Sequence, residues 1–284
     1  MQIRSILFKF KNIRYIRLLS IVLIVAGLVS SDAFALDPMG PATTDLREGE
    51  FNIGVDYSKS TMDIELNHGR YTEWLNGAFY EAGEAQTFKV KDFETSKIYA
   101  NLGFGIWDNC ELFVRLGGVN TEFGDSIWEA GEEFDSQTNF SFCIGSRATF
   151  YEDGYLTVGR LIQISWAKMD GDLKAPQWLE ADSIDLDLME ILISVGPTYS
   201  LDDGFWIYGG PFLHIVDGDI TDTFSETDEK GLLTSKYSWD IDETSKFGGY
   251  IGAQWEIAER TFFNIEYQHT SGANSVGLSL NCRY

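Results

Sequence analysis

The chain has 284 residues and carries 44 Asp and Glu against 21 Lys and Arg, so its formal net charge at neutral pH is −23. This balance argues against a nucleic-acid-binding protein, because binding to a phosphate backbone needs a basic surface. The chain is also rich in aromatic residues and Gly but has only 5 Pro, and its length suits a single domain.

The amino end is typical of a secretory signal peptide. It has five basic residues between positions 4 and 17, an apolar run over 18–29, and the small-x-small sequence Ala33-Phe34-Ala35. We expect cleavage after Ala35. An uncleaved anchor is disfavoured, because an apolar run of about 12 residues is shorter than the ~20 residues that a spanning helix needs. Residues 1–35 are therefore expected to be absent from the mature protein.

The rest of the chain alternates between apolar and polar residues, which is the period of a strand with two different faces. Four short turns lie between alternating runs and predict hairpins, at 107–109, 152–154, 202–204 and 258–260. Longer acidic segments separate the other runs. The predicted strands are 51–58, 94–107, 110–121, 137–151, 154–167, 186–200, 204–218, 234–257, 261–270 and 274–284.

One hairpin is expected to rise above the others. Tyr237 and Ile241 keep the parity of Phe247 and Ile251, so the alternation continues well past the length of its neighbours. The chain is expected to turn near residues 228–231 and to return alongside itself. We therefore predict a tall hairpin at the end of the sheet that carries the long segments.

The last strand has the clearest alternation. Val276, Leu278, Leu280, Cys282 and Tyr284 are apolar, whereas the residues between them are polar or small. A strict period of two that ends on a terminal aromatic residue resembles the closing strand of a bacterial outer-membrane β-barrel.

Residues 36–284 as a whole resemble the bacterial outer-membrane β-barrel superfamily. The resemblance implies an all-β fold, a single antiparallel transmembrane barrel of about ten strands, with eight or twelve as alternatives, short periplasmic turns and long acidic extracellular loops. It also implies the surroundings and partners of such a barrel: outer-membrane lipid and lipopolysaccharide, periplasmic chaperones and the barrel-assembly machinery. That machinery would recognise the terminal strand through Leu278, Leu280 and Tyr284.

Strand parity also predicts which charged residues face the inside of the barrel. Charges in such an interior must pair, because unpaired ones are costly to remove from water. The sequence leaves two interpretations open: a plug of paired charges, or a narrow passive channel for small solutes. It slightly favours the plug, because no ring of charges of one sign is visible. The expected lumen residues are Lys97, Glu111, Arg115, Arg147, Glu190, His214, Lys246, Glu256 and Glu266.

Ten strands with a tall hairpin also resemble the omptin outer-membrane proteases. That family has an Asp two residues before its catalytic His. The corresponding position before His214 is Phe212, so no catalytic residue is carried over from this resemblance.

His269 and Ser271 resemble the His-x-Ser motif of the lipid A deacylases. The resemblance implies a Ser nucleophile that is activated by the His. The sequence departs from that family in two ways: Gly272 stands where the family has Asn, and no Asp or Glu follows Ser271 to orient the His. We therefore expect a structural or surface protein without enzymatic activity, and lipid A deacylation is the alternative.

Acidic residues gather in three segments of the chain. Residues 122–135 contain six acids and no base, 168–187 six acids and two bases, and 217–246 nine acids and three bases. Solvated loops explain most of this charge. Carboxylates also suit Ca²⁺ or Mg²⁺, which could bridge the loops to anionic headgroups, with Asp217, Asp219 and Asp222 as weak candidate ligands. No other cofactor is expected.

Overall fold

The computed structural model describes residues 36–124, 133–174, 181–202 and 204–284. The predicted signal peptide, 1–35, lies outside the described residues. No helix in the described ranges is long and apolar enough to cross a membrane.

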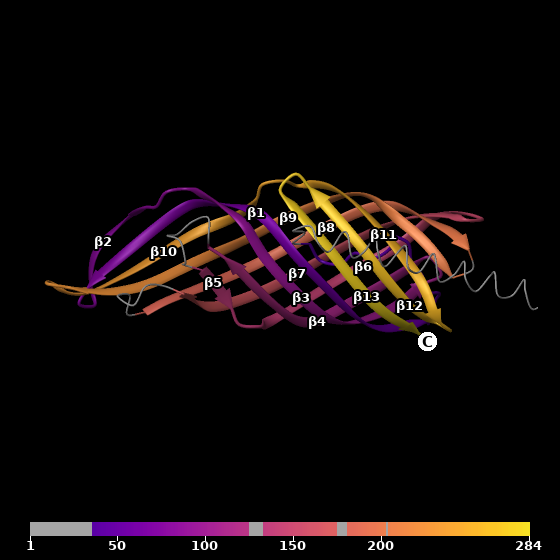
Figure 1. Cartoon of the computed structure of the whole chain (residues 1–284), viewed down its shortest axis with the longest axis horizontal. Helices are drawn as coiled ribbons and strands as arrows, with labels where there is room; N and C mark the ends of the chain where they lie inside the picture. The colour runs from indigo at the N-terminus through magenta and orange to yellow at the C-terminus, as the bar shows by residue number, and fades with distance from the viewer. Residues whose placement is uncertain (1–35, 125–132, 175–180, 203) are drawn as a thin grey trace, which may run out of the picture. The chain divides into compact units, whose positions relative to one another are not determined.

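The described chain is an antiparallel β-structure of thirteen strands, in which neighbouring strands run side by side and the strands of the near and far walls cross in projection (Figure 1). All four predicted short turns are confirmed, because strands end and begin on either side of each. The strands are β1 (Phe51–Leu75), β2 (Ala78–Glu84), β3 (Phe88–Trp107), β4 (Cys110–Phe123), β5 (Glu133–Ser136), β6 (Asn139–Asp153), β7 (Leu156–Lys174), β8 (Ala181–Asp202), β9 (Phe205–Asp228), β10 (Gly231–Glu243), β11 (Phe247–Ala258), β12 (Thr261–Thr270) and β13 (Ala273–Arg283).

Ten strands close into a ring at the end of the barrel that carries the C-terminus, and we call it the wider ring. The order around the ring is β1, β3, β4, β6, β7, β8, β9, β11, β12 and β13. β1 closes it by pairing with β3 on one side and with β13 on the other. The ring therefore leaves no free edge, as a barrel in lipid requires.

Further from the C-terminus the barrel has only eight strands around it, and we call this part the narrower ring. β10 takes the place of β11, β12 and β13 between β9 and β1. β5 takes the place of β6 between β4 and β7. We call the level at which the wider ring meets the narrower ring the step. There the Asp63 amide donates to the Gly272 carbonyl over 2.8 Å, which joins β1 to the β12–β13 turn.

The predicted single strand over 234–257 is wrong, because β10 and β11 are separate strands. Ile241 is buried inside the narrower ring, whereas Phe247 is 76% exposed on the outside of the wider ring. The connection at 244–246 therefore exchanges the inner and outer faces while the odd-numbered residues stay apolar. Because the alternation in the sequence continues unbroken, it does not reveal this exchange of faces. The predicted turn of the tall hairpin is confirmed, since β9 ends at Asp228 and β10 begins at Gly231.

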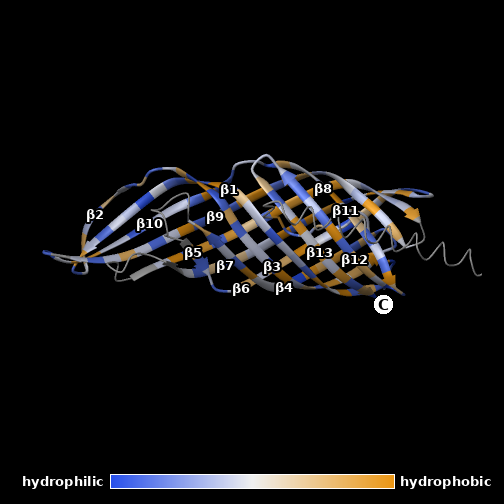
Figure 2. Ribbon diagram, in the orientation of Figure 1, coloured by the Kyte–Doolittle hydropathy of each residue, from blue (hydrophilic) through white to orange (hydrophobic). Residues whose placement is uncertain are grey.

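The two faces of the barrel exchange their hydropathy along the long strand β8. Figure 2 shows hydrophilic and hydrophobic residues as alternating bands along the strands. On β8 near the short-turn end, Ile193 faces outward and Ser194 is buried inside. Further along the same strand, Asp185 faces outward and Leu186 is buried inside. The wider ring thus has the apolar outside of a membrane-spanning barrel, whereas the narrower ring has the polar outside of a barrel in water.

The outside of the wider ring carries an apolar belt, which the exposed Arg160 of β7 interrupts. The exposed side chains of this belt include Ile53, Val55, Ile98, Leu102, Phe104, Leu112, Leu116, Ile144, Ile193, Val195, Ile207 and Ile251. The narrower ring has instead an apolar core inside, where Phe123 packs 5.2 Å from Phe93 and 4.8 Å from Phe134 between ring centroids. Side chains alone can fill an eight-stranded barrel, and they do so here.

The position of the belt predicts a contrast between two substitutions on the outer face of β8. Ile193→Lys should lower the free energy of unfolding by roughly 2–4 kcal/mol, because it places a charge against lipid. Asp185→Lys, on the same face beyond the belt, should change it by no more than about 0.5 kcal/mol. Guanidinium unfolding in phosphatidylcholine bilayers, followed by Trp fluorescence, measures both. Equal costs would contradict the position of the belt.

Candidate functional site

Residues 36–50 form a segment that we call the plug. It lies inside the wider ring as far as Leu46, whereas Arg47, Glu48 and Gly49 are exposed at the short-turn end. Leu36, Met39, Ala42 and Leu46 are each no more than 1% exposed. The segment starts level with Ser275, whose hydroxyl donates to the Leu36 carbonyl over 3.1 Å, and descends to the short-turn end before it enters β1. The plug therefore occupies the lumen through the membrane-spanning part of the barrel.

Glu266 on β12 holds the plug by its backbone. Its two carboxylate oxygens accept hydrogen bonds from the amides of Met39 and Gly40, both over 2.9 Å. Gln268 donates from Nε2 to the same carboxylate over 2.6 Å and to the Asp37 carbonyl over 2.9 Å. Gly40 has a φ of +70°, a conformation that favours glycine and lets two successive amides point at one carboxylate.

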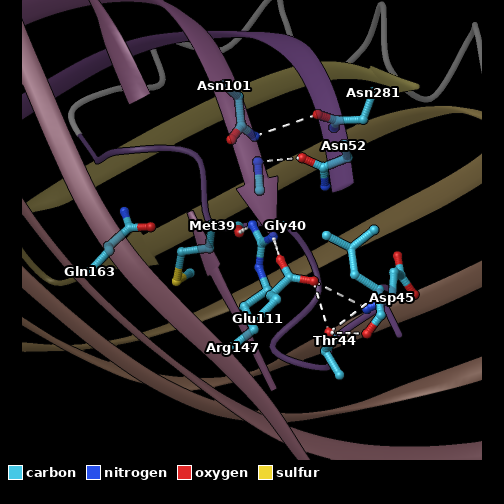
Figure 3. A network of polar contacts seen from close by, with 12 residues as sticks. Met39, Gly40, Thr44, Asp45, Asn52, Asn101, Glu111, Arg147, Gln163 and Asn281 are labelled. Atoms are coloured by element: carbon cyan, nitrogen blue, oxygen red, sulfur yellow. Dashed lines mark hydrogen bonds and ion pairs between the residues drawn. The ribbon is translucent and has the colours of Figure 1, made fainter. Parts of the chain in front are cut away.

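Glu111 on β4 and Arg147 on β6 hold the plug from the opposite wall (Figure 3). Arg147 Nη1 lies 2.6 Å from Glu111 Oε1, and Nη2 donates to the Met39 carbonyl over 2.6 Å. Glu111 Oε2 accepts from the Thr44 hydroxyl over 2.9 Å and from the Asp45 amide over 3.3 Å. One ion pair of the wall thus bonds to three residues of the plug.

Two further ion pairs tie plug side chains to the wall. Asp37 Oδ1 lies 2.7 Å from Lys97 Nζ on β3. Asp45 Oδ2 lies 2.6 Å from Arg283 Nη2 on β13, and it also accepts from Gln254 Nε2 over 2.8 Å. Because these partners come from several strands around the ring, the plug crosslinks the wall from within.

Lys97 extends the network to the other side of the lumen. It also pairs with Glu190 on β8, whose Oε2 lies 3.2 Å from His214 Nε2. Lys97, Glu190 and His214 are all buried. Lys97 and Glu190 are therefore each paired with an opposite charge, as a buried charge needs, and His214 adds a polar contact to Glu190.

Arg115 on β4 is paired within the wall itself. Its Nε lies 2.7 Å from Asp56 Oδ2, and its Nη1 donates to Gln163 over 3.1 Å. The guanidinium also lies over the ring of Phe113, 4.7 Å from the centroid. Beside Arg115, the plug and the wall leave a polar cavity of about 30 Å³, which is room for only about two water molecules.

Most of the residues that the sequence predicted for the lumen lie in this network. Lys97, Glu111, Arg115, Glu190, His214 and Glu266 are buried, and Arg147 is nearly so. The structure places Lys246 and Glu256 elsewhere. Lys246 is exposed in the β10–β11 connection, 3.2 Å from Glu243, and Glu256 is exposed at the β11–β12 turn, where it accepts from the Arg260 amide.

The plug is not predicted from the sequence, although this segment supplies many of the polar partners in the lumen. The segment has neither strand nor helix periodicity, so pattern analysis left it unassigned. One signal was available: Leu36, Met39 and Leu46 are apolar residues in a stretch that no predicted strand used.

The terminal strand closes the ring against the start of β1. The Tyr284 amide donates to the Phe51 carbonyl over 2.8 Å, and the two rings stack with centroids 5.2 Å apart. Leu280 is 45% exposed on the belt, and Leu278 pairs with Tyr57 two residues further along the strand. The three residues expected to form an assembly signal thus sit on the closing seam of the barrel.

His269 and Ser271 are both exposed at the step between the wider and the narrower ring. His269 Nδ1 lies 2.6 Å from Asn274 Oδ1, which also accepts from the Tyr267 hydroxyl over 2.9 Å. An amide therefore stands beside this imidazole where the deacylase family has an acid. Phe212, which occupies the omptin Asp position, is buried against Tyr250.

The candidate cation ligands lie on two faces of β9. Asp217 and Asp219 are exposed on the outside, whereas Asp222 has the opposite parity and faces inward. Asp219 stands directly between Asp187 of β8 and Asp240 of β10 in the strand register. No group of three or more Asp, Glu, His or Cys in the described ranges is arranged to hold a metal ion.

The bonds of Glu266 predict a specific loss of stability. In Glu266→Gln one oxygen is replaced by an amide NH₂, so one of the buried amides of Met39 and Gly40 loses its acceptor. We expect the free energy of unfolding to fall by about 1–3 kcal/mol. Glu259→Gln, the same exchange at an exposed turn, should change it by no more than about 0.5 kcal/mol. Guanidinium unfolding in lipid bilayers measures both, and similar small effects would show that Glu266 does not hold the plug.

No protein-family model matches the sequence, and no curated protein is similar to it at a significant level. Among solved structures, the chain is similar to the outer membrane protein OprG from Pseudomonas aeruginosa, with 10% identity and a TM-score of 0.44 over 84% of this chain and 97% of that chain. It is similar to the translocator domain of the autotransporter NalP from Neisseria meningitidis, with 9% identity and a TM-score of 0.44 over 84% and 89%. For the outer membrane protease OmpT from Escherichia coli, the identity is 11% and the TM-score 0.38 over 82% and 97%.

The architecture of the chain itself identifies its class. Its wider ring is closed, so all its strands are paired on both sides, and the outside of that ring is an apolar belt. Polar and charged side chains face the inside. These three features together are those of a transmembrane β-barrel, and the chain is an integral outer-membrane β-barrel.

Proposed function

We propose that this barrel is a sealed scaffold that presents a rigid structure on the cell surface, rather than a channel for solutes. The observation that carries the proposal is that the interior is filled at two levels. The plug fills the wider ring, and the apolar core fills the narrower ring.

A solute would have to pass both levels. In the wider ring the plug leaves a cavity of only about 30 Å³ beside Arg115. In the narrower ring the path is blocked by buried apolar side chains such as Phe93, Phe134 and Leu186. An apolar constriction excludes water and ions even where side chains move slightly. Passage through this barrel would need both levels to open together.

The narrower ring supports a surface role. A barrel that served only to span the membrane would need no second core beyond the belt. Here β1, β8 and β9 each run on for many residues beyond the belt, with Asp185, Asp187 and Asp219 facing water. Their inner side chains form a core of their own. A structure with its own core keeps a fixed shape, which suits presentation of a binding surface.

Single-channel recording tests the proposal. The refolded mature protein in a planar bilayer should give no discrete conductance steps, with heat-modifiable gel mobility as the control for folding. A variant that lacks residues 36–46 should unfold at a lower temperature but remain silent, because the apolar core of the narrower ring is still present. Reproducible steps from the intact protein would overturn the proposal in favour of a passive channel.

A second candidate function is lipid A deacylation at His269 and Ser271. The observation in its favour is that both side chains are exposed at the outer limit of the belt, the level at which an acyl chain of lipid A would approach. If Asn274 accepts the Nδ1 proton of His269, Nε2 is left as a base for a nearby hydroxyl.

Mass spectrometry of lipid A tests this second candidate. Incubation of refolded protein with lipopolysaccharide should release one acyl chain, and both His269→Ala and Ser271→Ala should abolish the release. Ser245→Ala, a hydroxyl removed from the neighbouring β10–β11 connection, serves as the control. Intact lipid A after incubation with folded protein would eliminate this activity.

A further inference from the structure

The end of the barrel opposite the C-terminus is a four-stranded sheet in the order β2, β1, β10 and β9 (Figure 1). Asn76 at the β1–β2 turn fastens the two hairpins of this sheet together. Its side chain accepts from the Leu232 amide over 3.0 Å and donates to the Lys230 carbonyl over 3.2 Å. The sheet is thus held in one shape before any partner arrives.

The inner face of this sheet carries a continuous stack of aromatic rings. Tyr237 stacks on Trp239, with centroids 5.6 Å apart, at the edge of the apolar core. Further out, Tyr237 lies between Tyr71, at 5.7 Å, and Phe224, at 5.8 Å with an interplanar angle of 9°. Tyr71, Tyr237 and Phe224 are only partly buried. They therefore present ring surface to the outside of the cell.

Carboxylates surround these rings on the same face. The Tyr71 hydroxyl donates to Glu81 Oε1 over 3.1 Å, and the Ser235 hydroxyl lies 3.5 Å from Glu73 Oε1. The hydrogen bond to Glu81 raises the pKa of Tyr71. Burial, with the nearby carboxylates of Glu73 and Asp222, raises the pKa of Tyr237.

The basic residues of the four strands lie away from these rings. Lys236 pairs with Thr72, and Arg70 pairs with Ser238. Each of these pairs is one position from the Tyr71–Tyr237 pair, so both basic side chains lie on the other face of the sheet. Lys59, the remaining Lys or Arg of these strands, lies further down β1 and pairs with Glu94. The inner face of this sheet therefore combines aromatic rings with negative charge.

The sheet also has an edge suited to a further strand. Among the described strands, β2 pairs with β1 alone. It carries Phe79 and Tyr80, which are 68% and 54% exposed. Exposed aromatic residues far from lipid are characteristic of surfaces that bind proteins, and an unpaired edge is a template for an added strand.

We propose that an extended basic polypeptide segment docks on this sheet. Its backbone pairs with the edge of β2, and alternate Lys or Arg side chains reach across β2 to the ring of Tyr71, which lies over Gly83, and to the carboxylates of Glu73 and Glu81. Cations are attracted both by carboxylates and by the faces of aromatic rings. Charge complementarity favours this occupant over an anionic glycan, which the carboxylates repel, and over a neutral glycan, which has no positive charge to pair with them. The inference rests on the proposed surface role and names its partner.

Fluorescence anisotropy with a labelled decalysine peptide tests the inference on the refolded mature protein in phosphatidylcholine nanodiscs. The peptide should bind, and a decaglutamate peptide and a neutral oligosaccharide should not. Tyr71→Leu should weaken binding about tenfold, as for a hot-spot ring, whereas Tyr71→Phe, which keeps the ring, should not. The double variant Glu73→Gln with Glu81→Gln should weaken binding at least as much. A decalysine N-methylated at every residue, which has no amide donor left on either edge, should also bind at least tenfold more weakly.

A matched control separates this site from the general negative charge of the protein. The double variant Asp185→Asn with Asp187→Asn removes two carboxylates from the outside of the narrower ring and should leave peptide affinity within about twofold. An equal loss in both double variants would overturn the site. Equal binding of the N-methylated peptide would overturn the strand pairing, and preferential binding of the oligosaccharide would overturn the basic partner. Conductance steps would refute the sealed barrel but would not alter these peptide results.

Discussion

The interior volume of a closed barrel grows with the number of strands, and wall side chains alone fill it only when the strands are few. This constraint explains both halves of the molecule. Eight strands enclose a space that wall side chains such as Phe93 and Phe134 fill by themselves. The ten-stranded ring is wider, and the chain fills it with its own residues 36–50. The charges of the wall then find partners in the plug, with Glu266 bonding two backbone amides and Lys97 pairing with Asp37.

The exchange of hydropathy along single strands divides the molecule by solvent. A strand such as β8 passes from lipid to water without a change of parity, because only the hydropathy of the residues on its two faces changes. Ile193 faces lipid, whereas Asp185 faces water on the same side of the strand. The same covalent scaffold therefore anchors the protein and supports the aromatic and acidic sheet at the far end of the barrel. A plugged lumen leaves that sheet as the part of the structure best placed to meet a partner.

Much of the wider ring follows from the sequence, because alternation in a barrel strand directly reports lipid on one side and the lumen on the other. The tight turns and the inward positions of Lys97, Glu111 and Arg115 follow from that parity. The break between β10 and β11 does not, since Ile241 and Phe247 are both apolar and share parity although one faces the core and the other lipid. The plug does not follow either. Its contacts with Glu266 and Arg147 join residues far apart in the chain, and an irregular backbone has no period to read.

Hydrogen exchange at the amides of Met39 and Gly40 tests most directly whether the plug fills the lumen. In the folded mature protein these two amides are buried and donate to Glu266. They should exchange as slowly as the strand amides of the wider ring, for example that of Gly103, over hours at neutral pH. Exchange within seconds, as in a frayed terminal tail, would contradict a plug that fills the wider ring.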